Sequence, residues 1–249
     1  MAHVTDSHWQ KWGRTNPYYA VLSDDKFRKE NLANNTKEFF DSGFSQADRV
    51  VALLSRHFGP MSLESALDFG CGVGRVMVGL GRHFRQVTGI DISPDMLAEA
   101  RRNLDHFKIS NATLLESDDR LSNVAERFDL VHTYIVLQHI PVARGRIIIN
   151  SLLSHLKPRG AIALHVTLRR NLSPLRQLTY QARRSLPALH YAVNAVRGRP
   201  ITEPFVQMNE YDLVELIELL SARGMGEAIV VPEQHGTYST ATLYARKIA

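Results

Sequence analysis

The chain has 249 residues, a length typical of one α/β domain, and 44% of them are apolar, which is enough to form a buried core. No apolar stretch reaches the roughly 18 residues that a membrane-spanning helix needs, and the first residues contain no apolar signal-peptide segment. The single cysteine, Cys71, excludes an internal disulfide framework and a zinc site built on cysteines. The net charge of +5 permits an anionic partner without requiring one. These features predict a soluble, cytoplasmic protein.

Apolar runs alternate with amphipathic runs along the chain, which is the pattern of a mostly parallel sheet with helices on both faces. The apolar run at 128–136 is nearly continuous, so we expect it to form a central strand. Strands are predicted at residues 65–69, 87–92, 113–116, 128–136, 161–168, 227–231 and 240–248. Helices are predicted at residues 74–84, 94–106, 141–156 and 211–224, with a weaker helical stretch after the polar turn at 117–120.

Capping residues mark the ends of two predicted helices. Ser93 followed by Pro94 provides an N-cap and a proline in the first turn, where its missing N–H costs nothing. Asn209, with Asp212 three residues later, is predicted to cap the last helix. Gly224 is predicted to end that helix, and two strands follow it.

A glycine-rich turn follows the first predicted strand. The strand ends in Asp68, and Gly70, Gly72 and Gly74 then precede a helix. Glycines at these positions let the backbone approach a ligand closely and direct amide N–H groups into the gap. The G-x-G-x-G spacing differs from the G-x-G-x-x-G of dinucleotide-binding turns. Asp91, 21 positions after Gly70, is placed to accept hydrogen bonds from both hydroxyls of a ribose. The turn therefore suits a nucleoside without a pyrophosphate.

Four motifs in chain order carry a family resemblance. They are DFGCGVGRV, GIDIS with Asp91, ESDD, and FDLVHTYIVLQHIP followed by LKPRG. Together, over residues 65–168, they resemble the consecutive motifs of class I S-adenosylmethionine-dependent methyltransferases. The resemblance implies an α/β fold with a doubly wound, mostly parallel, seven-stranded Rossmann-like sheet. Its last strand would be antiparallel, which explains why two strands follow the final helix.

The resemblance also implies the cofactor and the residues that bind it. The methionine part of S-adenosylmethionine would lie against Asp68 and the turn backbone, and Asp91 would hold the ribose hydroxyls. Asp118 would accept a hydrogen bond from the adenine amino group, unless it serves only as a turn cap. Asp119 would donate its backbone amide to the ring, and Ile92 would pack on the adenine face. The implied binding set is Asp68, Gly70, Gly72, Gly74, Asp91, Ile92, Asp118 and Asp119.

Four segments organise the chain. Residues 1–60, aromatic and polar near their start, are expected to form an N-terminal helical cap. Residues 61–168 are expected to form the cofactor-binding core and residues 169–208 a helical insertion before the last helix. Residues 209–249 would then complete the core sheet.

Methyl transfer to a hydroxyl requires a base within hydrogen-bond reach, because an alkyl hydroxyl is a poor nucleophile at neutral pH. His139 follows the central strand at its carboxyl end, where ligands bind in open α/β sheets, so it is the first candidate. His165 lies near the end of the next strand, and His235 is expected in the loop at 232–239 on the same edge. The alternative is that these histidines are hydrogen-bonded parts of the scaffold.

Substrate contacts are expected from the cap and from the residue before His139. Tyr18 and Tyr19 are candidates for a lid that stacks on substrate or cofactor, and Gln138 is assigned to substrate binding. The alternative for the two tyrosines is ordinary helix packing. No base-methylation signature [DN]-P-P-[YF] follows the central strand.

Magnesium is a second cofactor that some sugar O-methyltransferases use. A hard cation needs carboxylate ligands, but Gln138 and His139 stand where such enzymes tend to place an acid. The ligands would have to come from elsewhere, for example Glu203 or Glu210, and no metal site is assigned.

The expected insertion is strongly basic. It contains no Lys, Asp or Glu before Glu203, which fits an anionic substrate, a membrane surface or nucleic acid. The alternative is a helical lid or an oligomer contact, for example in a homodimer, with a solvated arginine face. Its arginines are residues 169, 170, 176, 183, 184, 197 and 199.

The favoured function is methyl transfer from S-adenosylmethionine to a hydroxyl of a small polar acceptor. Similarity to methyltransferases of bacterial, notably actinobacterial, polysaccharide assembly suggests a sugar or oligosaccharide. The alternatives are methylation of RNA or another nucleic acid, and N-methylation of a small metabolite. Nucleic acid is the less favoured partner because no RNA-binding module is present. A nonenzymatic S-adenosylmethionine binder is a further alternative.

Overall fold

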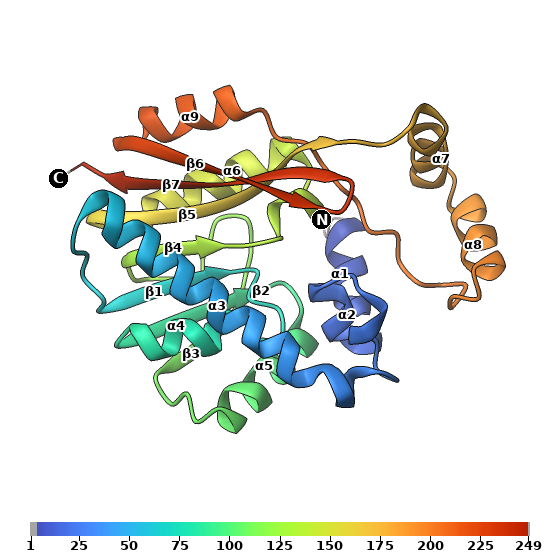
Figure 1. Ribbon diagram of the computed structural model, residues 1–249, viewed down its shortest axis with the longest axis horizontal. Helices are drawn as coiled ribbons and strands as arrows, with labels where there is room; N and C mark the ends of the chain where they lie inside the picture. The colour runs from blue at the N-terminus through green and yellow to red at the C-terminus, as the bar shows by residue number, and fades with distance from the viewer. Residues whose placement is uncertain (1–3, 249) are drawn as a thin grey trace.

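A seven-stranded sheet forms the centre of the molecule in the computed structural model, which describes residues 4–248 (Figure 1). The first three residues of the expected cap therefore lie outside the described part. The strand order is β3-β2-β1-β4-β5-β7-β6, with β7 antiparallel to both of its neighbours. The strands are β1 (Ser65–Phe69), β2 (Gln86–Asp91), β3 (Ala112–Glu116), β4 (Phe128–Thr133), β5 (Leu156–Arg170), β6 (Met225–His235) and β7 (Tyr238–Lys247). The predicted doubly wound sheet is confirmed, and β4 is central as expected.

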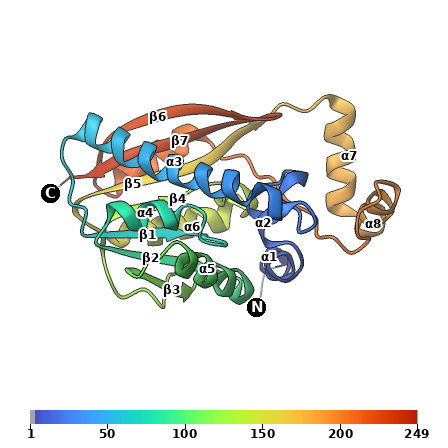
Figure 2. The same cartoon turned by 60° about the horizontal axis from the view of Figure 1, so that its bottom comes forward.

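Helices cover both faces of this sheet. Because successive side chains of a strand point to opposite faces, the residues of each strand pack alternately into two hydrophobic cores, one on each side of the sheet. Ala66 of β1 packs toward α3, whereas its neighbour Leu67 packs toward α6 and α9. Figure 2 shows α3 running across one face of the sheet. The helices on that face are α3 (Leu32–Phe58), α4 (Met77–His83) and α5 (Pro94–His106); those on the other are α6 (Val142–Ser154) and α9 (Leu213–Ala222).

The chain reverses its direction of winding beside β1. It passes from β1 outward to β2 and β3 and then returns to β4 on the other side of β1. All four strands are parallel, so their carboxyl ends meet at one edge. A crevice opens at such a switch point, and ligands of open α/β sheets bind there.

Four short helices lie on the side of the molecule toward which these carboxyl ends point. The N-terminal α1 (Val4–Thr15) and α2 (Pro17–Val21) lie beside the strand ends, while α7 (Pro174–Ser185) and α8 (Pro187–Val196) stand away from the sheet (Figure 1). Two 3-10 turns complete the set, one of which, Leu137–His139, carries the first candidate base. Within residues 4–248, no helix is long and apolar enough to cross a membrane.

The predicted N-cap is confirmed for α5 and is wrong for α9. The Ser93 hydroxyl accepts a hydrogen bond from the amide of Met96 at the start of α5, as expected. At α9 the cap is Asp212, whose carboxylate accepts from the amides of Val214 and Glu215. Asn209 was therefore the wrong residue: its side chain donates to the Gln138 carbonyl across the carboxyl edge.

Three further predictions of secondary structure differ from the structure. The expected weak helix after residues 117–120 is absent, because Asp118 closes a turn instead, by accepting from the amides of Arg120 and Ser122. Residues 157–160, which separate the predicted helix at 141–156 from the predicted strand at 161–168, belong to the long strand β5. The final hairpin is longer than predicted, so His235 ends strand β6 rather than lying in a loop.

Candidate functional site

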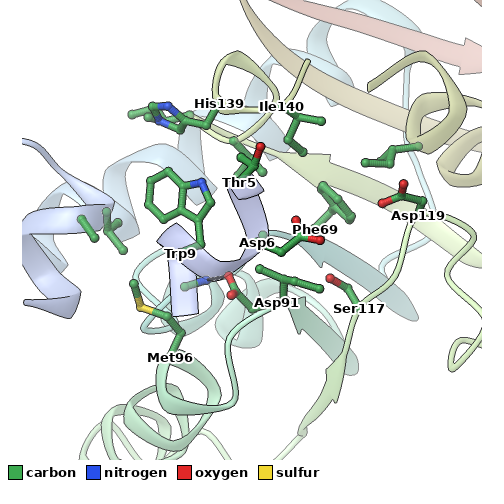
Figure 3. A pocket seen from close by; sticks show the side chains of 18 of the residues that line it. Thr5, Asp6, Trp9, Phe69, Asp91, Met96, Ser117, Asp119, His139 and Ile140 are labelled. Atoms are coloured by element: carbon green, nitrogen blue, oxygen red, sulfur yellow. Dashed lines mark hydrogen bonds between the residues drawn. The ribbon is translucent and has the colours of Figure 1, made fainter. Parts of the chain in front are cut away.

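An inner cavity lies at the carboxyl ends of β1, β2 and β4, beneath α1 and α2 (Figure 3). Its volume is about 100 Å³, and it is narrow because α1 crosses it. We define it by six of its lining residues: Trp9, Gly72, Asp91, Ile92, Asp118 and His139. The elements that the motifs predicted to surround a cofactor therefore do surround one cavity.

The glycine turn forms the floor of this cavity, and side chains would not fit there. Gly70 and Gly72 have φ values of +69° and +52°, in the left-handed region that favours glycine. A Cβ at Gly70 would lie 2.5 Å from Val136, and one at Gly72 would lie 2.8 Å from Val21. Gly74 instead faces α5, so it serves helix packing and does not line the cavity.

Asp91 is held rigidly at the end of β2. Its two carboxylate oxygens accept from the amides of Gly72 and Ser93, both at 2.9 Å. Each oxygen can accept a further hydrogen bond, so the carboxylate can still receive two hydroxyl donors. Burial raises the pKa of Asp91 to about 6, although the amide donors oppose this shift.

Asp119 takes part in an ion-pair bridge that closes the cavity. The Arg144 guanidinium, near the start of α6, contacts the Asp119 carboxylate at 2.7 Å and Asp6 of α1 at 2.5 Å. All three side chains are largely buried and line the cavity. Sequence reasoning missed Arg144. A signal was present, because a cation in the first turn of a helix is unfavourable unless acids compensate it.

Asp68 does not line the inner cavity. Its carboxylate lies 2.7 Å from Nδ1 of His132, on the neighbouring strand β4, and both side chains are almost fully buried. His132 Nε2 has no hydrogen-bond partner among residues 4–248. Asp68 therefore acts in this structure as the partner of a buried histidine, and its contact with a methionine moiety remains a prediction.

A larger outer cavity of about 760 Å³ adjoins the inner one. It lies among α2, the segment that carries α7 and α8, and the turn between β6 and β7. We define it by Tyr19, His139, Tyr180, Arg183, Phe205 and His235. Val21, Ile135 and His139 line both cavities, so the two meet at these residues.

His139 is oriented as a proton acceptor at this junction. Its Nδ1 lies 2.7 Å from the Gln207 carbonyl, which can only accept, so Nδ1 carries the proton. Its Nε2 is then unprotonated and receives the Gln138 side-chain amide at 3.3 Å. Burial lowers the pKa of His139 to about 4, which keeps the ring neutral at pH 7. The Trp9 ring of α1 packs against it, with centroids 4.9 Å apart (Figure 3).

Ile135 adopts an unusual backbone conformation where the chain leaves β4. Its φ is +62°, a region that β-branched residues rarely enter. Its amide donates to Nδ1 of His165 at 3.3 Å. The strained residue lies where the inner and outer cavities meet.

The other two predicted catalytic histidines behave differently from His139. His235 lines the outer cavity, but His165 is fully buried and lines neither cavity. Their rings stack with centroids 5.2 Å apart, so His165 supports His235 from behind. Burial lowers the pKa of His165 to about 3.

His165 and His235 also lie near Glu233, and potential ligand atoms of these three residues are within 4.8 Å of one another. The Glu233 carboxylate already contacts Arg49 at 3.3 Å and receives the Tyr134 hydroxyl at 3.1 Å. Two imidazoles suit zinc or another transition metal, whereas magnesium prefers oxygen ligands. The cluster therefore does not supply a magnesium site.

The two glutamates considered for magnesium do not form a site either. Glu203 pairs with Arg28 at 3.0 Å, and Glu210 pairs with Arg170 at 3.1 Å. Each carboxylate is thus already compensated by an arginine within the described part of the chain.

The cap aromatics divide between packing and the cavities. The Tyr18 hydroxyl donates toward Glu99 and Asn103 of α5, and its ring packs on Phe39, so Tyr18 holds helices together and faces neither cavity. Tyr19 lines the outer cavity, as expected for a substrate contact. Trp9, which lies against His139, is closer to the candidate base than either tyrosine.

Comparison with known proteins agrees with this geometry. Residues 66–160 match a family model described as a methyltransferase domain. The chain is 28% identical over 158 residues to the ubiquinone biosynthesis O-methyltransferase of Hydrogenovibrio crunogenus, covering 63% of this chain and 62% of that protein. It is 24% identical over 126 residues to the carboxy-S-adenosyl-L-methionine synthase of Cronobacter sakazakii, covering 49% and 51%. The chain thus spans less than two thirds of the length of these curated relatives.

Among solved structures, the chain resembles magnesium protoporphyrin IX methyltransferase from Synechocystis PCC 6803 with bound S-adenosylhomocysteine. The TM-score is 0.66 at 17% identity, over 98% of both chains. A second similar structure is the N-methyltransferase NodS from Bradyrhizobium japonicum, with a TM-score of 0.56 at 18% identity over 93% of this chain and 98% of that one. The matched domain and the sheet order together identify the class I S-adenosylmethionine-dependent methyltransferase fold.

Proposed function

We propose that this protein transfers the methyl group of S-adenosylmethionine to a hydroxyl oxygen of an acceptor bound in the outer cavity. The observation that carries the proposal is the junction of the two cavities at Val21, Ile135 and His139. A donor in one cavity and an acceptor in the other would meet beside the unprotonated Nε2 of His139. Such alignment supplies much of the rate of a methyl transfer.

The inner cavity offers groups suited to this cofactor, and at about 100 Å³ it would admit the whole molecule only if α1 moved outward. A Cβ at Gly72 would clash with Val21, so only glycine fits between the turn and α2. The fixed carboxylate of Asp91 can accept from two ribose hydroxyls. Ile92 offers an apolar surface, and Asp118 and Asp119 line the far end. When bound, S-adenosylmethionine supplies an electrophilic methyl group on a sulfonium.

His139 would act as the general base. The Gln138 amide, which occupies the Nε2 lone pair in this structure, would turn to the acceptor and free that lone pair. Nε2 would then accept the hydroxyl proton as the acceptor oxygen attacks, and the Gln207 carbonyl would stabilise the resulting imidazolium through Nδ1–H. Gln138 and His235, which line the outer cavity, would contact the acceptor. His165 would position His235 through the ring stack.

The cap and the insertion would both cover the site. We assign the expected N-terminal cap, through its helices α1 and α2, to a cover over the inner cavity, whereas α3 packs on the sheet. Residues 169–208 would form a wall of the outer cavity, which they line through Tyr180, Arg183 and Phe205. The acceptor would be small and polar, with a sugar as the favoured class from sequence. An O-methyltransferase among the curated relatives supports oxygen as the methylated atom.

The test is a transfer assay with methyl-labelled S-adenosylmethionine. The acceptors would be glucose, mannose, partly methylated oligosaccharides, hydroxylated carboxylates and RNA, each with magnesium and with chelator. We expect label on an acceptor hydroxyl, and the same rate in chelator. Label on RNA or only on nitrogen would contradict the proposed acceptor atom, and cofactor binding without any transfer would contradict the enzymatic function.

A further inference from the structure

Arg183 of α7 is a cation in the outer cavity that lacks an acidic partner. Its Nη2 lies 3.0 Å from Nδ1 of His190, and its guanidinium lies 5.5 Å from the ring centroid of Phe205. Its Nε is buried and finds no hydrogen-bond partner in the described part of the chain. Within residues 4–248, no carboxylate lies within ion-pair distance of this guanidinium. A buried N–H without an acceptor is unfavourable, so this guanidinium is incompletely compensated, and its side chain lines the outer cavity.

The charges around Arg183 do not compensate it. Two acids line the outer cavity, and both are already paired: Asp24 with Lys26 at 3.5 Å, and Glu203 with Arg28 at 3.0 Å and Arg199 at 3.7 Å. Burial, together with the nearby Arg197 and Arg199, lowers the pKa of Arg183, which means that its positive charge is unfavourable where it stands. An anion beside the guanidinium would relieve both effects.

Neighbouring residues hold Arg183 in this position. His190 Nε2 lies 2.8 Å from the Glu203 carbonyl, so Nε2 carries the ring proton and Nδ1 is left to accept from Arg183. His190 is itself buried, and Phe205 packs on its ring edge. The position of the Arg183 guanidinium is therefore fixed by its contacts with His190 and Phe205.

We propose that the outer cavity binds an acceptor that carries a carboxylate or a phosphate group, and that Arg183 holds this group. A guanidinium presents two parallel N–H donors that match both anions. Arg199 lines the same cavity and adds positive charge, and the rings of Tyr180, Phe205 and Tyr238 provide flat apolar walls for the rest of the acceptor. This inference rests on the proposed function and adds the substrate class to it.

The test compares matched probes on the protein loaded with S-adenosylhomocysteine. The pairs are 3,4-dihydroxybenzoate with catechol, and glucose 6-phosphate with glucose, measured by calorimetric titration. We expect at least one anionic probe to bind tenfold or more tightly than its neutral twin. Arg183→Gln should remove that preference and leave the neutral twin unchanged. Arg184→Gln, which changes an exposed arginine on the same helix, should keep the preference.

The possible results distinguish failure of the anion subsite from failure of the proposed methyltransferase function. Equal affinity within both pairs, or an equal loss of both members in Arg183→Gln, would overturn the anion subsite while S-adenosylhomocysteine still binds. Dissociation constants above about 10 mM for both anionic probes would also overturn it. Failure of S-adenosylhomocysteine to bind the wild-type protein would overturn the proposed function itself. Comparing carboxylate with phosphate then identifies which anion is preferred.

Discussion

The inner and outer cavities are built in different ways. The inner cavity is formed by strand ends and turns of the core between Phe69 and Ile148, and it is covered by α1 and α2 of the cap. The outer cavity is formed by side chains from the cap, the turn at 137–139, the insertion and the final hairpin. We infer that the first is shaped for one constant ligand, whereas the second can change its ligand through substitutions in separate segments.

The largest effect is expected at the junction of the two cavities. His139→Ala should lower kcat by ~10²-fold or more, because a positioned general base contributes at least that factor. The dissociation constant of S-adenosylhomocysteine should stay nearly the same. Steady-state kinetics and calorimetry measure the two quantities. His57→Ala, at an exposed histidine of α3, is the control. A fully active His139→Ala would remove the base assignment.

A smaller effect, confined to the inner cavity, is expected from Asp91→Ala. This change removes the acceptor for the ribose hydroxyls and frees the amides of Gly72 and Ser93. The affinity for S-adenosylhomocysteine should fall by more than tenfold, measured by calorimetry, and thermal unfolding checks that the fold persists. Asp105→Ala, at an exposed position in α5, should bind normally. Unchanged affinity in Asp91→Ala would overturn the cofactor assignment.

The cavities should also differ in their response to pH. Asp91 must be ionised to accept two hydroxyls, and its pKa is raised to about 6. Cofactor affinity should therefore be near its full value at about pH 7, about half of it at pH 6, and should approach a tenfold fall per pH unit below about pH 5. His139, with a pKa of about 4, should stay neutral through that range, so kcat at saturating cofactor should not change. Affinity that is constant between pH 7 and pH 5 would contradict the role of Asp91.

The smallest effect is expected where the cap is fixed to the core. Asp6→Asn weakens the contact with Arg144, and we expect S-adenosylhomocysteine to dissociate a few times faster. Stopped-flow fluorescence of Trp9, which lies at the same cavity, would follow release. Asp95→Asn removes a more exposed α1–α5 ion pair, with Arg14 at 3.9 Å, and should leave the rate unchanged. Equal rates in all three proteins would show that this bridge does not limit release.

Local sequence predicts the inner cavity well, because glycine spacing and a carboxylate at a strand end act through nearby backbone. The sheet and the position of β4 follow from the same patterns. The contacts of Asn209, Tyr18 and Asp68 do not follow from local sequence, because each is bound by a residue distant in the chain: the Gln138 carbonyl, Glu99 and His132 respectively. No local pattern specifies such partners, which the tertiary fold alone brings together.

The left-handed backbone at Ile135 has a consequence for how this protein can evolve. Holding a β-branched residue in that region costs about 1–3 kcal/mol, so the fold carries a fixed stability deficit at the point where its cavities meet. Substitution by glycine would relieve the backbone but remove a wall shared by both cavities. We therefore expect stabilising substitutions to accumulate elsewhere in the chain, while a side chain is retained at position 135 despite its unfavourable backbone conformation.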